Sequence, residues 1–139
     1  MTIADTGYWL ALLNPKDTYH ARALEVSATV KDPLITTWPV LAETCYFLLT
    51  ARGSRAQSAF IDSMIAEDFQ VFRMPSDSVP RISYLLKKYA DLPMDLADAS
   101  LVILAEHLSD GRILSTDQRD FNTYRWKNRE PFENLMFPT

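Results

Sequence analysis

Residues 95–115 read DLADASLVILAEHLSDGRILS, and the fold can be predicted from this stretch outward. Its first part, Asp95 to Leu108, is strongly apolar and long enough to form a helix. Asp110-Gly111 then predicts a turn, and residues 112–115 predict a short strand. The stretch therefore reads as a buried helix followed by a buried strand.

The same alternation runs through the rest of the chain. Asp17 is a good helix N-cap, Pro39 suits a first helical turn, and Gly53 is a plausible helix terminator. Strands alternating with helices imply an α/β fold with a parallel sheet covered on both faces. The strands are predicted at residues 1–4, 34–36, 69–74 and 112–115, with a possible edge strand at 134–138; the helices are predicted at 8–13, 17–30, 38–51, 54–68, 77–89, 95–108 and within 117–124.

Length and composition fit one globular domain, residues 1–139, with 47% hydrophobic and 23% charged residues. The single cysteine, Cys45, excludes an internal disulfide and a cysteine-based zinc site. The first residues lack the pattern of a secretory signal, and Glu43 and Pro39 interrupt the most apolar stretch, 34–51. We therefore expect a soluble, cytoplasmic protein.

The net charge of −4 argues against a nucleic-acid binder that works through bulk electrostatics alone. Charge is nevertheless uneven, because residues 112–129 hold five basic residues against Asp117 and Asp120, with Tyr124 and Trp126 among them. The five basic residues are Arg112, Arg119, Arg125, Lys127 and Arg129. A solvated surface explains this stretch at least as well as a nucleic-acid contact.

Four scattered acids are the candidate functional residues. Asp5 ends the first predicted strand and Asp117 follows the strand at 112–115, so both are expected at the same edge of a parallel sheet. Glu43 lies on the helix after the second strand. Asp98 heads an apolar helical stripe, where burying an acid is costly unless it is paired or coordinated to a metal.

Each acid also has a purely structural explanation. Asp5 could satisfy the amides of a turn, Asp117 could cap a helix, and Asp98 could be an N-cap, with Asp95 as the other candidate for that cap. Glu43 could instead pair with an arginine such as Arg52 or Arg81.

Clustered carboxylates without soft ligands suit Mg²⁺ or Mn²⁺, which can activate a water and neutralise charge on a phosphodiester. With three glycines, the chain has no glycine-rich phosphate loop, and it has no Gly-x-Ser-x-Gly motif. His20 and His107 fall on predicted helices away from the strand ends, which disfavours a histidine-based ribonuclease mechanism.

The ordered acidic segments resemble the four motifs of PIN-domain nucleases, and in particular the VapC-type toxins of bacterial type II toxin–antitoxin systems. The resemblance covers nearly the whole chain. Its segments are Ile3-Ala-Asp5-Thr6-Gly7, Pro39-Val-Leu-Ala-Glu43, Leu96-Ala-Asp98-Ala99, and Leu114-Ser-Thr116-Asp117 with Asp120-Phe121.

The resemblance implies a three-layer α/β/α sandwich around a mainly parallel sheet of four or five strands. It also implies a ribonuclease dependent on Mg²⁺ or Mn²⁺, with Asp5, Glu43, Asp98 and Asp117 as catalytic, metal-binding acids. Such proteins commonly form homodimers and are inhibited by a cognate antitoxin protein. The candidates to support the acids without binding the metal are Thr6, Asp95, Thr116 and Asp120.

Gly7 departs from the family pattern, because many members have an asparagine there, so any role of that amide is lost. The alternative function is a PIN-like RNA- or protein-interaction module with little or no nuclease activity. A phosphatase with an aspartyl nucleophile is a weaker alternative, since that chemistry normally needs a second acid where Gly7 stands.

Overall fold

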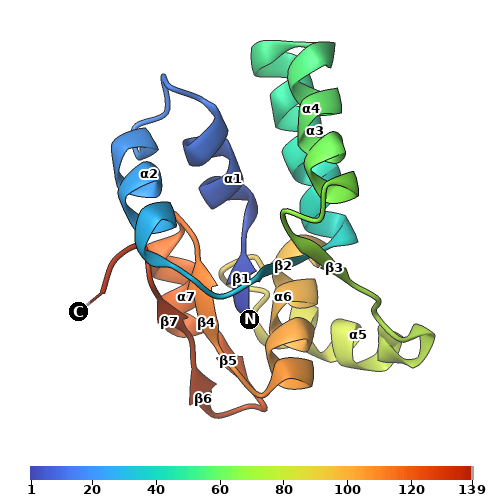
Figure 1. The fold of residues 1–139 in the computed structure, drawn as a ribbon. Coiled ribbons are helices and arrows are strands. Elements are labelled where there is room, and N and C mark those ends of the chain that lie inside the picture. Colours follow the sequence, from blue (N-terminus) through green and yellow to red (C-terminus); the bar gives the residue numbers. More distant parts are fainter. Residues whose placement is uncertain (139) are drawn as a thin grey trace.

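The computed structural model describes residues 1–138 and contains a five-stranded sheet flanked by helices (Figure 1). The strand order is β3-β2-β1-β4-β7, and every neighbouring pair is parallel. The predicted α/β class and parallel sheet are therefore confirmed. The strands are β1 (Thr2–Ala4), β2 (Leu34–Thr37), β3 (Gln70–Phe72), β4 (Arg112–Leu114) and β7 (Glu133–Asn134).

The helices connect the strands and cover the sheet. They are α1 (Thr6–Leu13), α2 (His20–Thr29), α3 (Trp38–Arg52), α4 (Ser54–Ile65), α5 (Val79–Lys88), α6 (Leu96–Leu108) and α7 (Gln118–Thr123), with a short 3₁₀ turn, η1 (Ser76–Ser78), before α5. Helices α3 and α4 pack side by side and project beyond the sheet (Figure 1). Gly53 joins them with a φ of 91°, a conformation that glycine adopts without a steric penalty.

The core lies between α6 and the middle of the sheet. Leu101, Val102 and Leu104 of α6 are fully buried, as are Ile3 of β1 and Ile113 of β4. The apolar composition of residues 96–108 thus reflects burial on nearly all sides of the helix. Over residues 1–138, none of the helices combines the length and the apolar character needed to span a membrane.

Element boundaries differ from the sequence prediction where polar side chains bond to nearby backbone. Helix α1 begins at Thr6 rather than residue 8, because Oδ1 of Asp5 accepts the Thr6 N–H over 2.7 Å. Helix α2 begins at His20 rather than residue 17, since Asp17 accepts the Tyr19 N–H and holds a turn there. Helix α4 ends at Ile65, and strand β3 is limited to residues 70–72.

The C-terminal segment contains one predicted element and one that the sequence did not indicate. The predicted edge strand exists as β7, one residue earlier and shorter than expected, and it pairs with β4. Antiparallel strands β5 (Arg125–Trp126) and β6 (Glu130–Pro131) form a hairpin that was not predicted. Two-residue strands carry too little alternation to be recognised from sequence.

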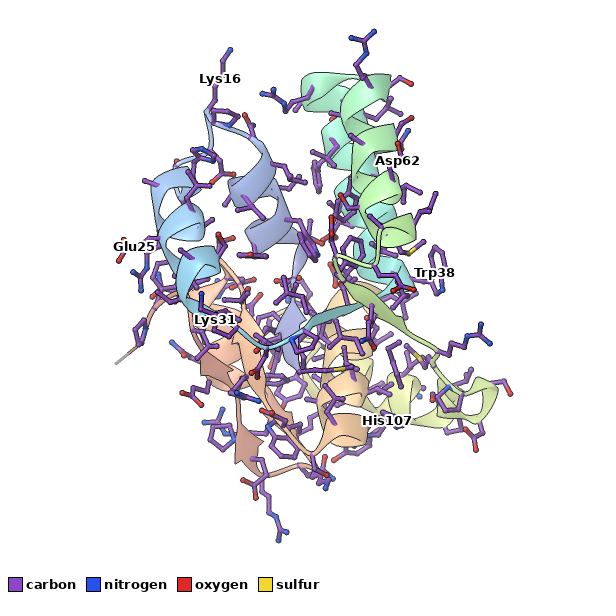
Figure 2. The ribbon with its side chains drawn as sticks, viewed as in Figure 1. Lys16, Glu25, Lys31, Trp38, Asp62 and His107 are labelled. Atoms are coloured by element: carbon purple, nitrogen blue, oxygen red, sulfur yellow. The ribbon has the colours of Figure 1, made fainter. Side chains whose placement is uncertain are left out.

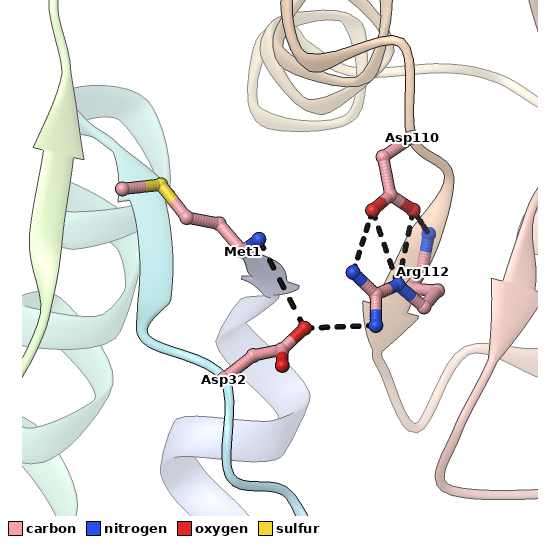
Figure 3. Close-up of polar contacts among 4 residues, drawn as sticks. All are labelled: Met1, Asp32, Asp110 and Arg112. Carbon is pink, nitrogen blue, oxygen red and sulfur yellow. Dashed lines mark hydrogen bonds and ion pairs between the residues drawn. The ribbon is translucent and has the colours of Figure 1, made fainter.

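A charge network ties the N-terminal ends of the central strands together (Figure 3). The Arg112 guanidinium binds Asp110 over 2.7 Å and Asp32 over 2.8 Å, and Asp32 also lies 3.9 Å from the amino group of Met1. Arg112 begins β4, whereas Asp117 follows the other end of that strand. This network therefore lies at the sheet edge opposite Asp5 and Asp117.

Candidate active site

Asp5 and Asp117 lie at the same edge of the sheet, as predicted, and the strands that they follow, β1 and β4, are parallel neighbours. Ala4 is in register with Leu114, and the Asp5 N–H donates to the Leu114 carbonyl over 3.0 Å. Ser115, fully buried between them, donates from Oγ to Oδ2 of Asp5 over 2.8 Å. The Ser115 Oγ also accepts the Asp117 N–H over 3.0 Å. One serine hydroxyl thus links the backbone of one acid to the carboxylate of the other.

Both acids also begin helices, so the structural explanation applies to each of them. Oδ1 of Asp5 caps α1, and Oδ1 of Asp117 accepts the Asp120 N–H at the start of α7 over 3.1 Å. The positive ends of these two helices therefore point toward the carboxylates, which favours negative charge there. Capping uses only one oxygen of each side chain.

Asp98 lies in the first turn of α6 and is not the helix cap. Asp95 takes that role, because its Oδ1 accepts the Asp98 N–H over 2.8 Å. The Asp98 side chain instead accepts a hydrogen bond at Oδ2 from the Tyr124 hydroxyl over 2.9 Å. The capping alternative therefore belongs to Asp95, and the Asp98 carboxylate is directed to a side-chain partner.

Glu43 occupies α3 at the border between core and solvent. Val40, one turn earlier, is fully buried, but Phe47, one turn later, is 43% exposed, so only one side of Glu43 borders the core. The proposed arginine pairing is wrong for Arg81, which binds Glu106 over 2.6 Å. Within residues 1–138, Glu43 makes no ion pair with Arg52 or any other basic residue.

The acids are close enough to raise each other's pKa. Burial raises the pKa of Asp5 to about 6, and the charges of Glu43 and Asp117 add to the rise while the Ser115 and Thr6 hydrogen bonds oppose it. Burial raises the pKa of Asp98 to about 8, helped by the charges of Asp95 and Asp5. Burial also raises the pKa of Asp117. These shifts connect all four predicted acids electrostatically.

The donor set fits a hard divalent cation. Over residues 1–138, no three acid, histidine or cysteine side chains are already arranged as a metal cage. However, Oδ1 of Asp98 and Oδ2 of Asp117 carry no hydrogen bond from the described residues, and all four side chains offer oxygen. A cation would offset the burial and the mutual repulsion that raise these pKa values, and oxygen ligands suit Mg²⁺ or Mn²⁺.

Three of the four candidate supporting residues, Thr6, Asp95 and Asp120, make hydrogen bonds with the acids. The Asp95 side chain accepts the Asp98 N–H, and the Asp120 N–H donates to the Asp117 side chain. The Asp120 carboxylate also accepts a hydrogen bond from Arg119 over 3.0 Å. Thr6 has a buried hydroxyl without a hydrogen-bond partner among residues 1–138. Thr116 packs directly on Gly7, where a side chain would overlap its hydroxyl.

Two residues at the site were not recognised from the sequence. Ser115 was passed over in favour of Thr116, although it lies two residues before Asp117, and side chains alternate in direction along a strand. Tyr124 was noted only as an aromatic residue in the basic stretch. Its contact with Asp98 spans 26 residues, and no local sequence pattern reports such a contact.

The basic stretch 112–129 does not form one surface at the acids. Arg112 lies at the opposite sheet edge, and Lys127 binds Ser109 over 2.8 Å. Arg125 donates to three carbonyls at the end of α7, while Arg119 is largely exposed beside Asp120. Most of these charges are therefore engaged in local structure, which favours the simpler explanation of the stretch.

Comparison with known proteins supports the resemblance. No family model matches the chain. The curated protein Ribonuclease VapC26 of Mycobacterium tuberculosis (strain ATCC 25618 / H37Rv) is 27% identical over 123 residues, which cover 88% of this chain and 91% of the relative.

Among solved structures, Mycobacterium tuberculosis VapC20, a toxin that cleaves the sarcin–ricin loop, has the same fold. The TM-score is 0.79 with 22% identity, and the match covers 86% of this chain and 92% of that one. In its ordered acidic motifs, its parallel sheet and these matches, the chain is similar to VapC-type ribonucleases and has the fold of a VapC toxin.

Proposed function

We propose that this protein is a ribonuclease toxin in which Asp5, Glu43, Asp98 and Asp117 hold Mg²⁺ or Mn²⁺ and catalyse hydrolysis of RNA phosphodiesters. The observation that carries the proposal is the juxtaposition of Asp5 and Asp117 at neighbouring strand ends, where Ser115 contacts both and the charge of Glu43 also helps to raise the pKa of Asp5. Buried carboxylates that repel one another are costly for a fold to keep, and such perturbed groups cluster at functional sites. The similarity to VapC26, a ribonuclease by name, supports the same conclusion.

The bound cation would supply a water of lowered pKa and offset the charge of the phosphodiester. The chain's own residues prepare the site for it. Ser115 fixes Oδ2 of Asp5, and the starts of α1 and α7 stabilise the charged forms of Asp5 and Asp117. Burial raises the pKa of Asp98 to about 8, so a cation held by this carboxylate would favour its ionised form.

The direct test is cleavage of RNA with Mg²⁺ or Mn²⁺, with and without EDTA. Asp5→Asn and Asp98→Asn are expected to abolish cleavage while the protein stays folded. Asp62→Asn is the matched control, because Asp62 is exposed on α4, remote from the strand ends (Figure 2). Full activity in both site variants would overturn the proposal. RNA that is bound but left intact under these conditions would favour the alternative, an interaction module.

A cognate antitoxin and a cytoplasmic location belong to the same proposal. A toxin ribonuclease that acts on the cell's own RNA works in the cytoplasm and needs a cognate antitoxin to restrain it. A small open reading frame for a DNA-binding protein next to this gene, and inhibition of cleavage by its product, would support this. Failure of that product to bind the chain would count against it.

We also propose a homodimer. Several apolar side chains of α3 and α4 are exposed in the single chain. One isolated exposed apolar residue is normal, but a group of them indicates an interaction surface. They are Tyr46, Phe47, Leu49 and Ile65. Light scattering should give twice the 15.9 kDa mass of one chain, and Tyr46→Glu should reduce it to the monomer mass. A monomer mass for the unaltered protein would rule the dimer out.

A further inference from the structure

We propose that Tyr124 is a positioning residue for the metal site, which fixes the Asp98 carboxylate so that Oδ1 is presented for ligation. The inference rests on the proposed metal-binding role of Asp98. It concerns a residue outside the four acidic motifs, in the segment that follows α7. Its basis is the contact between the Tyr124 hydroxyl and Oδ2 of Asp98 over 2.9 Å.

A tyrosine hydroxyl has one proton to donate, and Tyr124 gives it to Asp98. The Tyr124 side chain is fully buried, so this proton has no competing water. The bond occupies one carboxylate oxygen and sets the rotation of the group about its Cβ–Cγ bond. Oδ1 is then left without a hydrogen bond from residues 1–138, which is the requirement for a carboxylate that binds a cation through one oxygen.

The Tyr124 ring is itself held in place. It meets the rings of Tyr89 and Phe121 edge to face, with centroids 5.0 Å and 5.2 Å away. Its backbone N–H donates to Asp120 over 2.8 Å, and the hydroxyl of Tyr89 accepts the N–H of Arg125 over 3.0 Å. The hydroxyl therefore cannot swing away from Asp98 without moving packed aromatic rings.

Helix α7 connects Tyr124, which contacts Asp98, to Asp117. Asp117 is the N-cap of the helix and Tyr124 is its C-cap residue, so the two lie at opposite ends of a six-residue helix. One end carries a proposed metal-binding acid, and the other carries the donor that fixes a second one. The helix thus sets the position of Asp98 relative to Asp117, although the two acids belong to different segments of the chain.

The test is Mn²⁺ affinity, measured by isothermal titration on the purified protein without RNA. Tyr124→Phe removes the hydroxyl and keeps the ring, and is expected to weaken Mn²⁺ binding by about 10–100-fold, the usual range for partners of metal ligands. RNA cleavage should show a lower kcat with little change in KM. Tyr84→Phe is the matched control, because Tyr84 is 47% exposed on α5, outside the Tyr89 and Phe121 contacts that hold Tyr124, and should leave Mn²⁺ affinity unchanged.

A second variant separates positioning from general destabilisation. In an Asp98→Asn background, Tyr124→Phe should cause no further loss of Mn²⁺ affinity, because the contact it supports is already gone. Wild-type Mn²⁺ affinity in Tyr124→Phe, or equal losses in both backgrounds, would overturn the inference and leave the proposed function standing. Absence of Mn²⁺ binding in the unaltered protein would instead contradict the proposed function itself, and this inference with it.

Discussion

Ser115 donates a hydrogen bond from Oγ to Oδ2 of Asp5 over 2.8 Å, across 110 residues of sequence. Because the Ser115 Oγ also accepts the Asp117 N–H, removing this hydroxyl takes a hydrogen bond from both acids. We expect Ser115→Ala to lower kcat/KM for RNA cleavage by about 10–100-fold, the range typical of residues that orient metal ligands. The measurement is steady-state cleavage of a defined RNA in Mn²⁺.

The matched control for Ser115 is Ser63→Ala, since the Ser63 hydroxyl bonds only to the Ala59 carbonyl of its own helix. That variant should cleave at the wild-type rate. Equal rates for Ser115→Ala and Ser63→Ala would show that the serine bridge is dispensable.

Glu43 should contribute less to catalysis than the other acids. It is half-exposed and has no hydrogen bond from residues 1–138 to fix its side chain, whereas Asp5 and Asp98 are held by Ser115 and Tyr124. We expect Glu43→Gln to lower kcat by roughly 10-fold and Asp98→Asn by roughly 1000-fold or more, since a fixed ligand contributes several kcal/mol. Single-turnover cleavage of RNA measures both, and the reverse order would show that Glu43 becomes a principal ligand in the loaded site.

The arrangement of the fold could be predicted because its signals are local. Residues 95–115 alternate from apolar helix to turn to strand, and α6 and β4 follow that pattern within one residue. The start of α1 was misplaced because one residue, Asp5, both follows a strand and caps a helix. The β5–β6 hairpin was missed because its two-residue strands are too short to show an alternating pattern.

Some residues of the site could likewise be predicted from local sequence, and others could not. Asp5 and Asp117 could be placed from the geometry of parallel strands alone, since both follow adjacent strand ends. The position of Asp98 was predicted, but its partner Tyr124 lies in the segment between α7 and β5, and a linear sequence does not reveal that this segment lies against α6. Ser115 was within reach, because alternation along a strand distinguishes it from Thr116.

The metal-free protein should lose stability as pH rises through neutrality. The pKa values of Asp5 and Asp98 rise from 3.8 to about 6 and about 8 on folding, so the folded state binds protons more tightly than the unfolded state between about pH 4 and pH 8. Stability from these groups is therefore complete below pH 4 and is lost as each folded carboxyl ionises. Melting temperatures in EDTA should fall between pH 5 and about pH 8.

Asp98→Asn should flatten the upper part of this decline, because the residue with the higher pKa no longer titrates. Asp62→Asn, on the exposed face of α4, should keep the wild-type slope. Saturating Mn²⁺ should raise the melting temperature of the unaltered protein most at the alkaline end, where the acids are charged. A melting temperature that rises from pH 5 to pH 8 in EDTA would contradict the raised pKa values.

Gly7 and Thr116 form a close contact that leaves little room for a side chain at position 7. A Cβ at Gly7 would overlap the Thr116 hydroxyl and lie 3.2 Å from its Cβ. Alanine's helix propensity alone would stabilise α1 by roughly 1 kcal/mol, but the overlap should reverse this and destabilise Gly7→Ala by about 1–3 kcal/mol. Urea denaturation should show that Thr116→Ala rescues much of the loss in the double variant, because the overlapping oxygen is gone. Additive losses would show instead that Gly7 is needed for a reason other than Thr116.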